Sequence, residues 1–152
     1  MDRIDRQILD LIQRDATLST AEIAERVSLT TTPCWRRIQN LERRGLIRSR
    51  VALLDREQLN IGVDVFVAIK TNQHNAEWLS QFAQVVDEFD EVVEFYRMSG
   101  EVDYLMRVVV PDIAAYDQFY RRLIEQVRIA DVSSSFAMER LKYTTALPLD
   151  YA

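Results

Sequence analysis

Residues 30–45 of the chain read TTTPCWRRIQNLERRG, and this stretch predicts a short helix with two distinct faces. At the helical period of 3.6 residues, Cys34, Ile38 and Leu41 fall on one side. The opposite side carries polar and basic side chains, namely Thr32, Arg36, Gln39 and Arg43. We therefore expect the first face to pack against the protein and the second face to offer hydrogen-bond donors.

Both ends of this helix are marked in the sequence. Thr30 suits the N-cap, Pro33 is tolerated in the first turn, and Gly45 suits the position just past the end. Residues 36–50 hold one acidic residue, Glu42, and the arginines Arg36, Arg37, Arg43, Arg44, Arg48 and Arg50, which gives a formal charge of +5. A short basic helix of this kind fits the major groove of DNA.

Two further helices and a strand are expected around the basic helix. Asp2 can cap a first helix with the apolar stripe Ile4, Ile8, Leu11 and Ile12. Ser19 and Glu22 form a capping box that starts a short second helix, and the tight connection to the basic helix predicts a helix-turn-helix. Residues 46–53 alternate in polarity, which predicts a basic wing strand carrying Arg48 and Arg50.

Composition bounds the kind of protein. The 152 residues are 48% hydrophobic and 28% charged, as in a folded soluble protein. No apolar run approaches the roughly 18 residues of a membrane span, and the start lacks a signal-peptide core, so we expect a cytoplasmic protein. One cysteine and one histidine exclude a disulfide framework and the usual ligand set of a structural zinc site, and no cofactor is expected.

Charge is distributed unevenly along the chain. Residues 1–50 contain ten arginines and seven acidic residues, a formal charge of +3, whereas the remainder carries −8. The basic part can approach a phosphate backbone that repels the acidic part. We therefore predict a DNA-binding domain at residues 1–50, a strand and hinge linker at 51–62 ending in the Asn60-Ile61-Gly62 turn, and a second domain at 63–152.

The second domain reads as strand, helix, strand, strand, helix, strand. The expected strands are Val63–Thr71, Val92–Met98, Val102–Val110 and Val132–Lys142, with helices capped by Asn75 and Asp112. This order predicts an α+β fold of the ferredoxin-like βαββαβ type, with an antiparallel sheet and both helices on one face. Phe66, Val108, Phe136 and Met138 are expected on the open face, which a second copy of the chain would cover to form a homodimer.

Three motifs resemble the Lrp/AsnC family of bacterial transcription regulators, the leucine- and asparagine-responsive feast/famine proteins. They are Ile4-Asp5-Arg6-Gln7-Ile8-Leu9, Thr32-Pro33-Cys34-Trp35-Arg36-Arg37 with Leu41-Glu42, and Ser99-Gly100-Glu101-Val102-Asp103-Tyr104-Leu105. Residues 29–35 and 134–139 further resemble the branch that includes the regulator of cysteine detoxification. Ser28 stands where most members have glycine, so a left-handed backbone there would cost more.

The resemblance implies a winged helix-turn-helix followed by a RAM-type domain that dimerises, with dimers assembling into an octamer. It also implies a small amino acid effector bound between dimers, near Gly100 and Asp103 of the hairpin and near Ser135 and Phe136 of the last strand. The Asp103 carboxylate or nearby backbone would hold the ammonium group. By themselves, Gly100 and Asp103 are also typical of a plain turn.

The predicted function is sequence-specific binding of double-stranded DNA under the control of an amino acid. Recognition helices read bases with their N-terminal half, which points to Thr31, Thr32, Trp35, Arg36 and Gln39, with Arg43, Arg48 and Arg50 on phosphates. Trp35 can alternatively cover the second helix, and Cys34 is interpreted as a packing residue rather than a thiol sensor.

The alternatives to this function come from other classes. They are a charged surface on an ordinary helical bundle, a small ferredoxin-like dimeric enzyme and a non-specific DNA-packaging protein.

Overall fold

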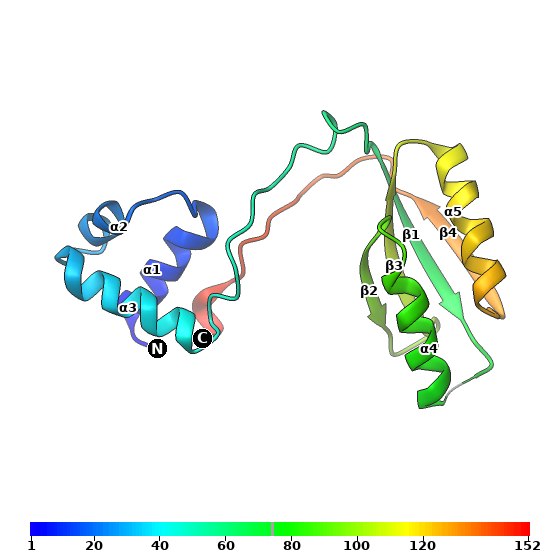
Figure 1. The fold of residues 1–152 in the computed structure, drawn as a ribbon, viewed down its shortest axis with the longest axis horizontal. Coiled ribbons are helices and arrows are strands. Elements are labelled where there is room, and N and C mark those ends of the chain that lie inside the picture. Colours follow the sequence, from blue (N-terminus) through cyan, green and yellow to red (C-terminus); the bar gives the residue numbers. More distant parts are fainter. Residues whose placement is uncertain (74) are drawn as a thin grey trace. The chain divides into compact units, whose positions relative to one another are not determined.

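The computed structural model describes residues 1–73 and 75–152, which form two compact units (Figure 1). The first unit comprises Met1–Leu53 and Leu141–Ala152, and the second comprises Leu54–Arg140. His74, expected as a surface residue of a loop, lies outside the described residues.

The N-terminal unit is a bundle of three helices, α1 (Arg3–Arg14), α2 (Thr20–Arg26) and α3 (Thr31–Arg43). The predicted N-cap of α1 at Asp2 and the predicted capping box of Ser19 and Glu22 at the start of α2 are confirmed. The structure adds Asp5, which completes a capping box with Asp2. The buried core contains side chains from all three helices and the connecting turn, namely Ile8, Leu9, Ile12, Ile23, Ala24, Val27, Cys34, Ile38 and Leu41. The predicted packing face of α3 is thus fully inside this core.

The ends of α3 lie where the sequence predicts them. Thr30 occupies the N-cap position, although its side chain makes no capping hydrogen bond. Beyond the helix, the N–H of Gly45 donates to the carbonyl of Glu42 and the N–H of Leu46 donates to that of Leu41. This pair of bonds is a Schellman motif, which needs a left-handed residue, and Gly45 has φ of 74°.

Arg37 ties α3 to the first turn of α1. Its guanidinium donates to Asp2 Oδ2 and Asp5 Oδ1, each at 2.7 Å. The Asp5 side chain is only 12% exposed, so the ion pair compensates a carboxylate that is largely removed from water. The backbone hydrogen bond from Asp5 and then the bond from Arg37 lower the pKa of Asp2.

The predicted wing strand at residues 46–53 is wrong. Within the described residues no strand lies between α3 and β1 (Val63–Lys70), and Val51 and Leu53 are 73% and 66% exposed. An alternating sequence favours extended backbone, but a strand also needs a neighbour that pairs with its N–H and C=O groups. The described part of a single chain provides none for this segment.

The C-terminal segment differs from the expected domain 63–152, because residues 141–152 group with the N-terminal unit. Gln13 of α1 clamps the backbone of Leu147: its Oε1 accepts from the Leu147 N–H at 2.8 Å and its Nε2 donates to the carbonyl at 3.1 Å. Leu149, in the short 3-10 helix η1 (Leu149–Tyr151), packs against the helical core. The alternation of polarity in 132–142 gave no sign of this docking.

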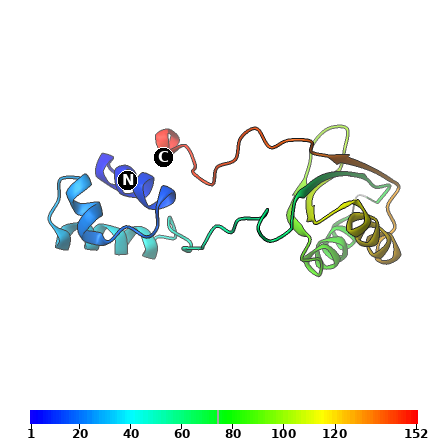
Figure 2. The same ribbon diagram turned by 90° about the horizontal axis from the view of Figure 1, so that it is seen from above.

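The second unit is the predicted split βαβ sandwich. Its elements follow the order β1, α4 (Ala76–Asp87), β2 (Val92–Arg97), β3 (Tyr104–Val110), α5 (Ile113–Gln126) and β4 (Asp131–Phe136). The strands form one antiparallel sheet in the order β2-β3-β1-β4, and Figures 1 and 2 show α4 and α5 on the same face. Asn75 and Asp112 cap the helices as predicted, and the fold class is confirmed.

The strand register corrects two of the residues expected on the open face. Val65, Val67 and Ile69 of β1 are fully buried under the helices, and Val108 pairs with Val65 and is also fully buried. Phe136 pairs with Val65 from the other side, so it lies on the helix face, where its ring meets Tyr116 of α5 edge-on at 5.2 Å.

Phe66 does lie on the open face of the sheet. It is 41% exposed and pairs with Arg107 on one side and Ser135 on the other. Met138 is 96% exposed but lies beyond β4, which ends at Phe136 and not at Lys142. The last strand is shorter than predicted because β1 begins at Val63 and leaves later residues without a partner strand.

None of the helices formed by the described residues combines the length and the apolar character that crossing a membrane requires.

Replacing Arg37 with methionine is expected to destabilise the N-terminal unit by about 1–3 kcal/mol, because Asp5 then keeps its mostly buried position without a cation. Calorimetric unfolding at pH 7 measures the loss, and faster amide hydrogen exchange in α1 assigns it to this unit. Arg44→Met is the matched control, since Arg44 is exposed and its side chain bonds to no described residue. Equal stability of the two variants would contradict the role assigned to Arg37.

Candidate nucleic-acid interface and effector site

The outward face of α3 displays the side chains predicted to contact DNA. Cys34, Ile38 and Leu41 are buried at 0%, 4% and 0% exposure, which fixes the rotation of the helix about its axis. The face opposite is exposed along the whole helix, with Thr31, Thr32, Trp35, Arg36, Gln39 and Arg43. Trp35 is 52% exposed, so it is accessible to a ligand.

The arginines of the basic segment have different surroundings. Arg37, on the side toward α1, is engaged by Asp2 and Asp5. Arg36 and Arg48 are exposed, and their side chains bond to no described residue. Arg50 is held by Glu42 at 2.9 Å, and Glu42 also accepts a hydrogen bond from Gln39 Nε2 at 2.9 Å. This double contact of Glu42 is not predictable from helical periodicity, because it joins α3 to an irregular segment.

The turn between α2 and α3 holds Ser28 in the left-handed region, with φ of 57°. The Ser28 N–H donates to Glu25 and the Leu29 N–H donates to Ala24, which is the same Schellman pattern that ends α3. Leu29 packs against the helical core, as expected for the residue that fills the angle between two helices. A serine in this place carries the backbone cost that glycine would avoid.

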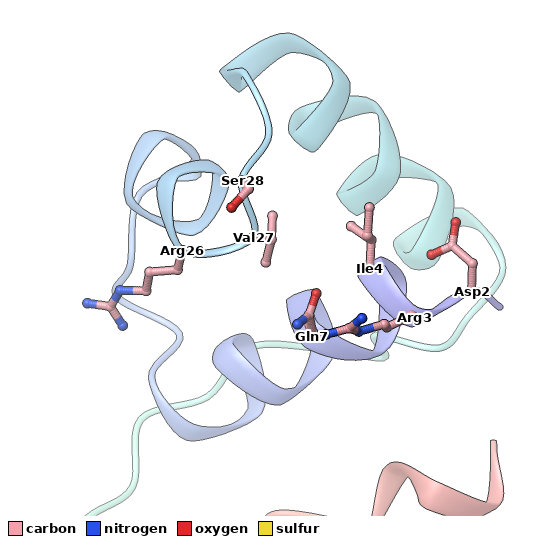
Figure 3. Close-up of a pocket in the computed structure, with 7 residues that line it drawn as sticks. All are labelled: Asp2, Arg3, Ile4, Gln7, Arg26, Val27 and Ser28. Atoms are coloured by element: carbon pink, nitrogen blue, oxygen red, sulfur yellow. The ribbon is translucent and has the colours of Figure 1, made fainter.

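A groove of about 520 Å³ with polar and apolar lining residues lies beside this turn (Figure 3). It is lined by α1 and the end of α2 with Asp2, Arg3, Ile4, Gln7, Arg26, Val27 and Ser28, and α3 contributes none of these residues. Figure 3 shows Arg26 pointing outward, away from Ile4. The groove is therefore distinct from the exposed face of α3.

Cys34 is placed as a packing residue. The side chain is fully buried, and burial raises the pKa of its thiol, with only a weaker opposing effect from Arg37. A thiol with a raised pKa forms little thiolate, the reactive species. Among residues 1–73 and 75–152, no three histidine, cysteine, aspartate or glutamate side chains are grouped as a metal site would require.

The hairpin between β2 and β3 contains the predicted effector residues Gly100 and Asp103. Gly100 has φ of 130°, which a residue with a side chain rarely adopts. Asp103 holds the end of β1: its N–H donates to the Ile69 carbonyl at 3.0 Å, and its Oδ2 accepts from the Thr71 N–H at 2.8 Å. The carboxylate thus has a structural role besides any role in binding.

Ser135 and Phe136, the other two predicted effector residues, are the last two residues of β4. Ser135 pairs with Phe66 of β1 on the open face, whereas Asp103 comes one residue before Tyr104, the partner of Ile69 in β1. Asp103 is therefore level with Lys70, which is four residues along β1 from Phe66, or about 13 Å at the usual rise of a strand. Within one chain the hairpin residues and the β4 residues do not converge on a single cavity.

Two groups near these positions were missed from the sequence. The hydroxyls of Tyr116 and Ser134 are hydrogen-bonded on the helix face, where burial raises the pKa of Tyr116.

On the open face, Asp64 accepts from Arg56 at 2.5 Å and Arg107 at 2.9 Å, and Arg107 also bonds Glu94 at 2.7 Å. Burial alone would raise the pKa of Asp64, but the two arginines outweigh it and lower the pKa. The sequence signal for this cluster was the alternating pattern of β1, which places Asp64 on the same face of the sheet as Phe66.

Comparisons with known proteins agree with both halves of this architecture. Residues 1–48 match the model of a winged helix-turn-helix DNA-binding domain, and residues 64–147 match that of the Lrp/AsnC ligand-binding domain. The chain is 53% identical to the DNA-binding transcriptional activator DecR of Escherichia coli K12, over 99% of both chains.

Two solved structures are also similar to this chain. An AsnC family transcriptional regulator from Agrobacterium tumefaciens is 64% identical with a TM-score of 0.97, over 99% of both chains. A transcriptional regulator of Neisseria meningitidis, in complex with L-methionine, is 33% identical with a TM-score of 0.94, covering 99% of this chain and 98% of its own. This chain therefore belongs to the Lrp/AsnC family of DNA-binding transcriptional regulators.

Proposed function

We propose that the chain recognises a specific sequence in double-stranded DNA by placing the exposed face of α3 in the major groove. Thr31, Thr32, Trp35, Arg36 and Gln39 contact base edges, because they occupy the first two-thirds of the helix and all are exposed. The observation that carries this proposal is the complete burial of Cys34 and Leu41, which leaves the opposite face turned outward.

Arg43, Arg48 and Arg50 bind phosphates in this proposal. All three are exposed and lie at or beyond the C-terminal end of α3. Phosphate contacts position a protein on the duplex and carry no direct sequence information. The net charge of +3 in residues 1–50 favours this approach.

The second unit binds a small amino acid in this proposal. The match to the Lrp/AsnC ligand-binding domain supports it, as does the L-methionine complex of the Neisseria regulator. Gly100, Asp103, Ser135 and Phe136 are the proposed effector residues. Because the hairpin pair and the β4 pair lie apart within one chain, the site takes the two pairs from different copies of the chain.

The second unit also mediates assembly of the regulator in this proposal. We propose a homodimer formed over the open face of the sheet, around Phe66, and an octamer of four dimers that creates the effector sites. The charged cluster of Arg56, Asp64, Glu94 and Arg107 is paired within the chain and has no net charge, so covering this face would leave none of these charges without an opposite partner. The proposed location is the cytoplasm, where the DNA is.

Regulation is favoured over catalysis and over passive DNA packaging. The relatives named above are transcriptional regulators, and the single cysteine is fully buried and therefore no candidate nucleophile. Packaging requires only phosphate contacts, whereas α3 also presents threonine, glutamine and tryptophan side chains.

Arg36→Ala is expected to weaken binding to the cognate site by about 1–3 kcal/mol and to relax base preference, whereas Arg48→Ala weakens binding to all duplexes alike. Titration of cognate and random duplexes at several salt concentrations separates the two effects. Arg121→Ala, an exposed arginine of α5, is the control that leaves binding unchanged. An equal loss on cognate and random DNA for Arg36→Ala contradicts base reading.

One or more free amino acids are expected to raise the melting temperature, since a ligand at 100 times its Kd stabilises the folded state by about 2.7 kcal/mol. A thermal-shift screen of the common amino acids measures this. Asp103→Asn keeps an oxygen for the Thr71 N–H but removes the charge, so it is expected to abolish the shift without unfolding the unit. If no amino acid shifts the protein, the effector proposal is wrong.

Phe66→Glu is expected to raise the dimer dissociation constant by at least about tenfold, because two like charges would meet near the centre of the proposed interface. Sedimentation equilibrium measures the dissociation constant. Ile113→Glu is the control, since Ile113 is 69% exposed at the start of α5, away from the sheet face. An unchanged dimer for Phe66→Glu shows that another surface joins the chains.

A further inference from the structure

Glu42 is the single acidic residue in the segment from Thr31 to Leu54. It contacts Gln39 and Arg50, two of the residues proposed to bind DNA. Its Oε2 accepts from Gln39 Nε2 at 2.9 Å, and its Oε1 accepts from Arg50 at 2.9 Å. Each carboxylate oxygen therefore has its own donor. The side chain of Glu42 is 33% exposed, so this bridge lies at the surface of the unit.

We propose that Glu42 is a positioning residue for DNA recognition, which fixes the carboxamide of Gln39 and holds Arg50 beside α3. The proposal rests on the function proposed above, in which Gln39 reads a base edge and Arg50 binds phosphate. Glu42 itself then sets base preference without having to touch a base.

The chemistry of glutamine gives the bridge this effect. A carboxamide presents a donor at one end and an acceptor at the other, and the two ends have nearly the same shape. A base pair in the major groove is identified by the order of its donors and acceptors, so a carboxamide that turns freely discriminates poorly. An ionised carboxylate only accepts, and it therefore keeps Nε2 of Gln39 toward Glu42 and leaves Oε1 directed elsewhere.

Arg50 depends on the same carboxylate. It follows the turn at Gly45 in a segment without strand pairing, and Glu42 is its only side-chain partner among the described residues. Holding Arg50 next to the helix places its positive charge where phosphates approach. In return, Arg50 neutralises a carboxylate that would otherwise repel the DNA backbone.

A structural role in folding would be a competing explanation, and the exposure of the bridge argues against it. The side chains of Arg50 and Glu42 are 46% and 33% exposed, and ion pairs with this exposure contribute little to stability. The two roles therefore differ in their observable: positioning changes base preference, whereas a folding role changes the melting temperature.

The test is a double-mutant cycle in the full-length protein with Glu42→Met, Gln39→Ala and the double variant. Each is used to select duplexes from a library randomised over the binding site. Glu42→Met is expected to reduce, by about tenfold, the preference at the base position that Gln39→Ala also relaxes, while preference at positions lost in Arg36→Ala persists. In base preference, the double variant is expected to match Gln39→Ala, because Glu42 acts on the base only through Gln39. The melting temperature is expected to stay at the wild-type value.

Glu25→Met is the matched control, because Glu25 is an exposed acid of the same unit whose side chain bonds to no described residue. It removes the same charge and is expected to leave base preference intact. A uniform gain in affinity for all duplexes with Glu42→Met, or additive losses in the cycle, would overturn the positioning role. Absence of any base preference in the wild-type protein would instead reject the proposed function itself.

Discussion

The burial of one face of α3 is the constraint on which the DNA-binding unit depends. Cys34, Ile38 and Leu41 are enclosed by α1 and α2. Burial of an isoleucine or leucine side chain such as Ile38 or Leu41 stabilises the fold by about 1.5–3 kcal/mol. Rotating α3 about its axis would expose these groups, so the packing defines which side chains face outward. Arg37 reinforces the same orientation, because it reaches the first turn of α1 from the edge of the packed face.

Local signals made most of the fold predictable from the sequence. Capping residues such as Ser19 and Asn75 act within one helical turn, and the order of strands and helices in the second unit follows from the period of hydrophobicity. The two strand predictions that failed share one cause. Residues 46–53 and the end of β4 alternate like strands, but pairing depends on a neighbour that is distant in the sequence or absent.

Part of the geometry around the candidate sites was predictable in the same way. Periodicity separated the two faces of α3, since a helix face depends only on spacing. It did not reveal that Glu42 bridges Gln39 and Arg50, because residues beyond Gly45 have no regular geometry. Likewise, the side of the sheet on which Phe136 lies depends on its pairing with Val65, and a shift of one residue reverses the faces.

The ion pair between Asp64 and Arg56 joins the open face of the sheet to the segment that precedes β1. Arg56 donates to the Ile61 carbonyl at 2.7 Å as well as to Asp64, and the Ile61 N–H donates back to Arg56. The expected hinge at Asn60 is therefore part of a closed turn fastened to β1. The backbone of residues 48–54 makes no hydrogen bond to a described residue, whereas residues 56 and 61 are joined by hydrogen bonds in both directions.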